Sequence, residues 1–171
     1  ADEATIFALG IYEDTGSLTH LTTTSEDLMA AAWLVSKGAK LDLVAEFITH
    51  ELTSSQIATL HELMKTAKEY TIQDTPVVVI SYSSPDYIDE FALIVRRFMH
   101  MENINVLFAI ISMAGRIYLI ARSRIADVNV GTVARDFGGG GHASAASATL
   151  KDMTLIDAQE RLIHSLHKHI R

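Results

Sequence analysis

The run Gly138, Gly139, Gly140, Gly141, His142 is the most unusual chemical feature of the sequence. Four consecutive glycines remove every side chain, so backbone N–H groups can approach an anion closely, and His142 adds a side-chain donor. The run is not a P-loop, which needs Lys-Ser or Lys-Thr after the glycines, nor a G-x-G-x-x-G dinucleotide fingerprint. The alternative interpretation is a flexible stop for the preceding helix, because glycine is common at helix C-termini.

Two other places carry groups suited to a phosphate or a metal ion. Arg122-Ser123-Arg124 ends a predicted strand, and guanidinium groups bind phosphates in pairs; the alternative is that these arginines are simply solvated. Asp14, in Tyr12-Glu13-Asp14-Thr15-Gly16, is a short acid beside a glycine turn, which suits Mg²⁺ or Mn²⁺. The alternative for Asp14 is an ordinary structural turn.

The composition limits what these groups can do. Fourteen Lys and Arg against twenty-one Asp and Glu give a net charge of −7, which disfavours nucleic-acid binding through a broad basic face. A phosphate-bearing ligand must therefore be held locally, by a few aimed groups or a metal. The sequence has no cysteine, so disulfides, thiolate metal sites and cysteine nucleophiles are excluded, and a cytoplasmic location is expected. No apolar run approaches the roughly 20 residues of a membrane span, so no membrane partner is expected.

Helix signals are strongest at three capping boxes. Thr24 with Asp27 opens a helix that Gly38 stops, Thr53 with Gln56 opens the next strong one, and Thr154 with Asp157 opens the last. Trp33 is expected to fill the core of the first of these. Other helices are expected over about residues 3–10 and 41–49, from a Ser84 cap with Pro85 in the first turn, and over 130–137 after an Asn129 cap.

Strand signals begin only after Asp74. Residues 77–80 form a continuous β-branched run, typical of a buried strand. Residues 105–113 and 116–122 predict an antiparallel hairpin joined at Ala114-Gly115, and 147–150 is one more candidate strand. The sequence thus predicts an α/β protein: residues 1–49 are helical, residues 75–171 form a mixed sheet with helices against it, and the boundary lies within a helix from Thr53 to Tyr70.

Several of these motifs together resemble one known family. Residues 11–17, Arg122-Ser123, and Gly138 to His142 with Ala145-Ala146 are similar, in a specific order and combination, to the later half of the DHH phosphoesterases, including their DHH-associated C-terminal domain. The resemblance covers nearly the whole chain. It implies that residues 1–52 are the C-terminal part of a DHH domain, 53–73 a linker helix, and 74–171 the DHH-associated substrate-binding domain.

The family resemblance also implies a chemistry. DHH phosphoesterases use a manganese pair, or magnesium, to activate water against a phosphate ester. Asp14 matches the last metal-binding aspartate, whereas Arg122, Ser123, Gly138 to Gly141 and His142 match the part that holds the substrate's phosphate or terminal nucleotide. The implied partners are a nucleotide or an RNA end, and the remaining domains of a longer parent chain.

The residues in and around these motifs resemble one branch of the family in particular. In that branch, a DHH unit precedes CBS domains and a tRNA nucleotidyltransferase or poly(A) polymerase domain. Tyr12-Glu13 before Asp14, and the stretches 23–27 and 30–34, carry this likeness. Ser147 stands where the family often has glycine, and Asn129 where it often has Asp. The DHH triplet is absent, so the chain is expected to be a fragment that binds no metal stably, with the metal in the parent.

Three hypotheses for the function follow. The preferred one is the substrate-binding part of a manganese-dependent phosphoesterase that acts on nucleotide or oligonucleotide phosphate esters. The second is a module that binds RNA or a nucleotide for an attached nucleotidyltransferase and hydrolyses nothing. The third is an α/β scaffold domain. The first two are not separated by residues in this chain, because both need Arg122 and the glycine run.

Overall fold

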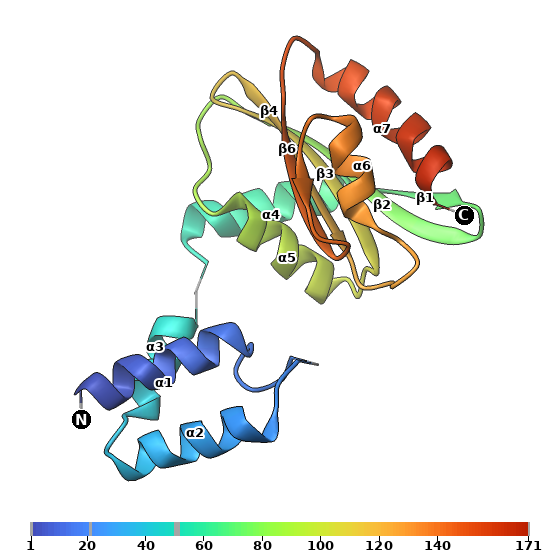
Figure 1. Ribbon diagram of the computed structural model, residues 1–171. Coiled ribbons are helices and arrows are strands. Elements are labelled where there is room, and N and C mark those ends of the chain that lie inside the picture. Colours follow the sequence, from blue (N-terminus) through green and yellow to red (C-terminus); the bar gives the residue numbers. More distant parts are fainter. Residues whose placement is uncertain (1, 21, 50–51, 171) are drawn as a thin grey trace. The chain divides into compact units, whose positions relative to one another are not determined.

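The computed structural model describes residues 2–20, 22–49 and 52–170. The chain divides into two compact units, Ala1–Glu51 and Leu52–Arg171 (Figure 1). The described residues of the first unit are helical and hold no strand, and the second holds a mixed sheet with helices, so the predicted α/β class is confirmed. Within the described residues no helix is both long and apolar enough to cross a membrane.

The first unit consists of α1 (Asp2–Asp14), α2 (Ser25–Ser36) and α3 (Leu41–Ile48). The capping box of Thr24 and Asp27 is confirmed. Helix α1 runs to Asp14, four residues beyond the predicted end at Gly10. The main hydrophobic cluster of the unit is small and consists, among the described residues, of the buried Ala4, Ala8, Leu34 and Val44.

Trp33 is not a core residue, which corrects the prediction. Its side chain is 60% exposed, because Ala31 and Leu34 are the residues of α2 that point into the unit. Three short helices have room for few large side chains in one core. A set of large apolar residues in this unit is therefore more than half exposed: Ile6, Phe7, Leu28, Met29, Trp33 and Phe47.

The second unit opens with α4 (Ser54–Thr66), whose Thr53–Gln56 capping box is confirmed. The linker helix predicted over residues 53–73 extends only to Thr66, because β1 (Lys68–Ile72) follows it and pairs antiparallel with β2 (Thr75–Ser84). Gln73 and Asp74 both have positive φ, 45° and 65°, which is the two-residue hairpin geometry that the helical prediction overlooked. The second unit begins at Leu52, so the boundary between the units precedes α4 and does not lie within a helix.

The sheet in the described residues has the order β1-β2-β3-β4-β6-β5. Only β2 and β3 are parallel, and every other pair is antiparallel. The predicted hairpin of β3 and β4 is confirmed, with positive φ at both Ala114 and Gly115. The remaining strands are β3 (Val106–Met113), β4 (Arg116–Ser123), β5 (Gly140–Gly141) and β6 (Ala145–Leu150).

Helix α5 (Phe91–Met101) begins six residues later than predicted. Ser84 does not cap it, because Ser84 still belongs to β2 and pairs with Met113 of β3. The hydroxyl of Ser84 instead accepts the N–H of Asp86 at 3.2 Å in a turn. Glu90, in a left-handed conformation with φ 52°, precedes the helix.

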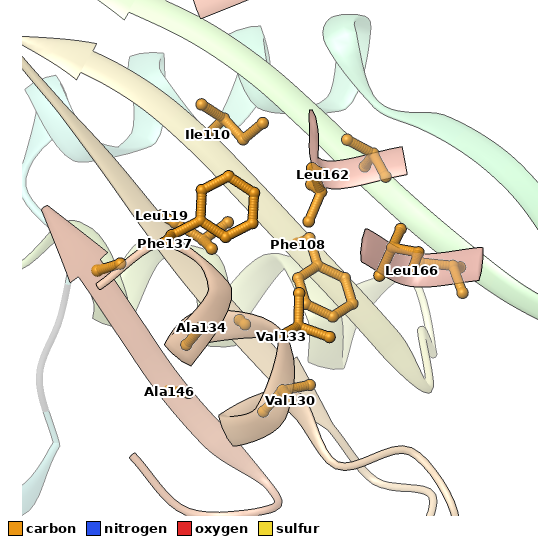
Figure 2. Packing of buried hydrophobic residues seen from close by; sticks show 14 of the residues in the cluster. Phe108, Ile110, Leu119, Val130, Val133, Ala134, Phe137, Ala146, Leu162 and Leu166 are labelled. Atoms are coloured by element: carbon orange, nitrogen blue, oxygen red, sulfur yellow. The ribbon is translucent and has the colours of Figure 1, made fainter. Parts of the chain in front are cut away.

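Helices cover both faces of the sheet (Figure 1). Helices α4 and α5 pack on one face, with Leu107 and Ile120 among the buried residues there. Helices α6 (Val130–Asp136) and α7 (Leu155–His169) pack on the other. Figure 2 shows Phe137, Leu162 and Leu166 around Phe108 in that second core. The caps at Asn129 and at Thr154 with Asp157 are confirmed.

The alternation of side chains along β4 decides where Arg122 lies. Leu119 and Ala121 belong to the core under α6 and α7, whereas Ile120 belongs to the core under α4 and α5. Because successive strand residues point to opposite faces, Arg122 shares the face of Ile120, and Ser123 shares the face of Ala121. Two neighbours in one motif are thereby sent to opposite sides of the sheet.

Candidate functional site

A pocket of about 760 Å³ lies where the end of β4, the glycine run and the start of α5 meet. Arg122 and Gly138 to Gly141 both line it, so the structure brings together two motifs that are separated in the sequence. On β6, the alternation of side chains places Ser147 and Thr149 on one face of the sheet and the buried Ala146 and Ala148 on the other. The other lining residues are Tyr87, Glu90, Phe91, Ala92, Met113, Tyr118, Leu119, Ile120, Ala145 and Lys151.

Arg122 is the strongest polar feature of this pocket. Its Nε is buried and has no hydrogen-bond partner among the described residues. Burial, followed by the nearby positive charge of Arg96, lowers the pKa of the guanidinium from its usual value, although an arginine stays charged in a protein. A half-buried cation with an unmet donor is costly. Because Arg122 lines the pocket, an anion there would offset its positive charge.

Ser123 does not line the pocket. Its side chain is buried on the other face, where the hydroxyl donates to the carbonyl oxygen of Ile125 and accepts the Ile125 N–H, both at 3.0 Å. These two bonds fix the turn that leaves β4. Ser123 therefore has a local structural role, and its side chain is not placed to contact a ligand in the pocket.

The first half of the glycine run does stop a helix. The N–H of Gly138 donates to Arg135 and that of Gly139 to Ala134, at 3.0 and 2.9 Å, and Gly138 has φ +73°. This is the usual glycine end of a helix. The simpler interpretation of the run is thus correct for these residues, whose N–H groups are used by protein carbonyls and do not face an anion.

The second half of the run forms the edge strand β5. A β-carbon at Gly141 would lie 2.4 Å from the Ala145 carbonyl oxygen, which leaves no room for a side chain. A β-carbon at Gly140 would meet nothing within 4 Å. Gly140 therefore faces open space, and the run supplies the pocket with a wall of bare backbone.

His142 lies just outside the pocket lining. Its side chain is exposed, and its backbone N–H donates to the Ala145 carbonyl at 2.8 Å. The residue thus closes the turn between β5 and β6, and its predicted part as a ligand donor has no contact to support it here.

The pocket contains side chains that the motifs did not indicate. Tyr118 could have been found from the sequence, because it precedes Arg122 by four residues on the same strand face. Tyr87, whose side chain is 58% exposed, and Glu90 had no such signal, since they reach the pocket only through the turn before α5. Lys151 reaches it from the end of β6.

The family of this chain follows from the comparison of its sequence with known families. The family model of the DHHA1 domain matches residues 78–171, which contain Arg122 and the whole glycine run. The chain belongs to the DHHA1 domain family. The suspected DHH-associated domain is thereby confirmed.

The relatives of this DHHA1 protein include proteins of two kinds. An A-adding tRNA nucleotidyltransferase of Geobacter sulfurreducens is 44% identical over 162 residues, covering 95% of this chain and 18% of that protein. A cyclic-di-AMP phosphodiesterase, PdeA of Listeria monocytogenes, is 27% identical over 172 residues. The aligned region covers 96% of this chain and 24% of PdeA. The chain therefore spans about a fifth to a quarter of the length of these relatives.

A solved structure shares the DHHA1 protein's fold. The exopolyphosphatase-related protein from Bacteroides fragilis superposes with a TM-score of 0.74 at 19% identity, covering 92% of this chain and 47% of that one. The match includes both the helical and the sheet-containing parts, because it extends over nearly the whole chain. It confirms the architecture of helices and mixed sheet.

Asp14 belongs to no metal-binding cluster among the described residues of the DHHA1 protein. It is the last residue of α1 and is exposed. In the described parts of the chain, no group of three or more His, Asp or Glu side chains is arranged to hold a metal. Mg²⁺ and Mn²⁺ need several oxygen or nitrogen ligands, so the residues described here do not by themselves fit a metal centre.

Proposed function

We propose that the pocket binds the phosphate of a nucleotide or short oligonucleotide, as the substrate-binding part of a manganese-dependent DHH-type phosphoesterase. One observation carries the proposal: Arg122 presents a half-buried guanidinium whose Nε has no partner among the described residues, in a pocket of about 760 Å³. Phosphate oxygens are among the acceptors whose geometry a guanidinium matches, through two parallel hydrogen bonds.

The rest of the pocket supports a nucleotide over a smaller anion. Tyr87 and Tyr118 line it beside Arg122, and aromatic rings stack on nucleobases. Gly140 leaves open space for a bulky ligand. The net charge of −7 makes such a local site necessary, because the protein as a whole repels phosphates.

The hydrolytic part of the proposal needs groups beyond those described here. Asp14 alone does not hold a metal pair, so the remaining ligands belong, in this proposal, to other domains of a longer parent. The exposed apolar residues of the first unit, such as Phe7, Met29 and Phe47, support packing against those domains, because surfaces of this kind are usually covered. We place the parent in the cytoplasm, in keeping with the absence of cysteine.

A second candidate function has its own supporting observation. The relative at 44% identity is an A-adding tRNA nucleotidyltransferase, whereas the phosphodiesterase is 27% identical. In this alternative, the same pocket holds an RNA end or nucleotide for an attached nucleotidyltransferase and no bond is hydrolysed. The two candidates share the ligand chemistry and differ only in what the parent does with the ligand.

Calorimetric titration of AMP, ADP and inorganic phosphate into the 171-residue chain tests the shared ligand chemistry. Arg122→Ala removes a charge-assisted hydrogen bond worth about 1.5 to 3 kcal/mol, which predicts a loss of affinity of roughly 10- to 150-fold. Arg116→Ala is the matched control, since Arg116 is exposed at the opposite end of β4 and should bind as wild type does. Equal affinities in all three proteins would refute the proposed pocket. Manganese-dependent hydrolysis by the full-length parent would then separate the two candidates.

A further inference from the structure

Strand β1 forms an open edge of the sheet. In the described residues it has a neighbour, β2, on one side only. The two-residue turn between these strands is closed by Ile72 and Thr75, and the residues that close such a turn exchange hydrogen bonds. Because bonded and unbonded pairs alternate along an antiparallel ladder, Glu69 and Thr71 are not bonded to β2. Their backbone N–H and C=O groups therefore point away from the sheet.

The pairing partner of Thr71 agrees with this assignment. It is Pro76, which has no N–H to donate. Glu69 and Thr71 are both exposed, and among the described residues neither makes a backbone hydrogen bond outside the ladder. An exposed edge with unmet N–H and C=O groups is a template for pairing with a further strand.

Each face of the sheet has a hollow next to this edge. On one face, a hollow of about 400 Å³ lies along α7 at Ile156 and Gln159, and Gln159 donates a 3.3 Å hydrogen bond to the hydroxyl of Tyr70 in β1. On the other face, a hollow of about 260 Å³ is lined by Glu69 of β1 and by Met64. Ile156 is 71% exposed and Met64 43%, so apolar surface is left uncovered on both sides of the edge.

The edge is complementary to a second copy of itself. Glu69 and Thr71 are placed symmetrically about Tyr70, so an antiparallel copy pairs Glu69 of each chain with Thr71 of the other. Tyr70 then faces its own counterpart at the two-fold axis of an isologous dimer. A register that pairs Glu69 with Glu69 places like charges opposite each other. A register that pairs Thr71 with Thr71 leaves Lys68 and Glu69 without a strand opposite them.

The charged side chains favour the same register. Lys68 lies opposite Ile72 of the second copy, and Asp74 is two residues further along that copy. Lys68 and Asp74 are exposed and belong to no ion pair in the described part of the chain. Opposite charges in diagonal positions across two strands attract each other. The dimer therefore gains two pairs of Lys68 with Asp74, related by the two-fold axis.

We propose that two copies of this chain associate along β1, antiparallel and centred on Tyr70, so that their two sheets become one. Residues opposite each other in an antiparallel pair point to the same face, so both α7 helices lie on one face, on either side of the new strand pair. The partner is a second copy of this chain, and the proposal is independent of what the pocket at Arg122 binds.

A disulfide at the two-fold axis tests the register. The chain has no cysteine, so one substitution gives one thiol. Tyr70 and its counterpart form an unbonded pair, whose Cα atoms lie about 4.5 Å apart, within the range of about 4.4 to 6.8 Å that a disulfide spans. Tyr70→Cys should give a covalent dimer on mild oxidation, seen on a non-reducing gel. Lys68→Cys is the matched control and should not cross-link, because its two thiols are four strand residues, or about 13 Å, apart.

A second experiment removes an N–H that faces the open side. Proline is tolerated on an edge strand where its N–H would face solvent, so Thr71→Pro keeps the fold and blocks the pairing of two copies. Sedimentation velocity over a range of protein concentrations should show a monomer–dimer equilibrium for the wild-type chain and monomer alone for this variant. Thr71→Val keeps the N–H and should dimerise as the wild type does. Circular dichroism establishes that each variant is folded.

Charge reversal leaves every backbone donor in place. Lys68→Glu and Asp74→Lys should each raise the dissociation constant of the dimer at least about tenfold, because two attractive pairs become two repulsive ones. The double variant exchanges the charges and restores both pairs, so its dissociation constant should return to within about threefold of the wild-type value.

A wild-type chain that stays monomeric at every concentration would overturn the proposal. Equal cross-linking of Tyr70→Cys and Lys68→Cys would also overturn it, since chance collisions would then explain the disulfide. A dimer that is unaffected by Thr71→Pro and by both charge reversals would mean that the interface lies elsewhere on the chain, which contradicts pairing along β1.

Discussion

A β-carbon on Gly139 would lie 2.1 Å from the carbonyl oxygen of Ser147, so the glycine run rests directly on the backbone of β6. One residue later the situation is reversed, because a β-carbon on Gly140 would touch nothing within 4 Å. Two adjacent glycines thus serve different purposes. Gly139 permits packing, whereas Gly140 keeps the pocket open.

The first prediction compares these two glycines. Gly139→Ala should lower the free energy of unfolding by about 1 to 3 kcal/mol, because overpacking forces the backbone to shift. Gly140→Ala should change it by less than about 0.5 kcal/mol. Urea unfolding of both variants measures the difference, and equal destabilisation would contradict the packing described here.

The second prediction concerns ligand access. Gly140→Val should leave the circular dichroism spectrum unchanged but weaken AMP binding at least about tenfold, or about 1.4 kcal/mol, because its methyl groups extend into the pocket. Thr71→Val, at an exposed position of β1 outside the pocket lining, is a control of similar size. Unaltered AMP affinity in the Gly140 variant would mean that the ligand does not approach the edge strand.

The third prediction sets stability against binding at Arg122. Arg122→Met keeps most of the side-chain volume and removes a half-buried charge with an unmet donor, so the free energy of unfolding should rise by about 1 kcal/mol. AMP binding should be lost in the same variant. Arg116→Met, at an exposed position, should alter neither quantity, and a less stable Arg122→Met would show that Arg122 serves the fold.

The fourth prediction is a pH dependence of stability at Asp136, which joins α6 to α7. The hydrogen bond from Ser165 at 2.8 Å, followed by His169 at 2.9 Å and the charge of Lys168, lowers the pKa of Asp136 below its ordinary 3.8. A carboxyl whose folded pKa is depressed stabilises the protein above the unfolded pKa, and this stability is lost as the pH falls through the folded value. The loss should therefore appear only in acid.

Urea unfolding between about pH 6 and pH 2.5 measures this contribution. Asp136→Asn should cost about 1 kcal/mol near pH 6 and much less at the acid end, because both proteins are then uncharged at this position. Asp152→Asn, at an exposed site between β6 and α7, is the control. A constant difference between wild type and Asp136→Asn at every pH would contradict the assignment.

The fifth prediction is that the 171-residue chain hydrolyses phosphodiesters poorly. Asp14 is the only metal-ligand candidate that the family motif indicates in this sequence, and a two-metal site needs several ligands for each ion. Bis-nitrophenyl phosphate should show no turnover above background with Mn²⁺. Turnover that a chelator abolishes and Asp14→Asn leaves intact would reveal a metal site outside the family motif.

The local structural features could be predicted from the sequence. The three capping boxes, at Thr24, Thr53 and Thr154, and the Ala114-Gly115 turn are all present, because each depends on residues within a few positions of one another. The chemical type of Arg122 and the presence of four glycines also marked the site. These features, together with the change of pattern after Asp74, determined the fold class.

Only the tertiary structure showed which segments form the remaining strands and which residues become neighbours in space. Strand β1 looked helical and β5 looked like a loop, since a strand exists only through hydrogen bonds to a partner that is distant in sequence. Ser84 was misjudged as a cap for the same reason: its pairing with Met113 outweighs a local signal. Arg122 faces the pocket and Ser123 does not, because side chains alternate across a strand, and only the packing of α5 shows which of those two faces meets the glycine run.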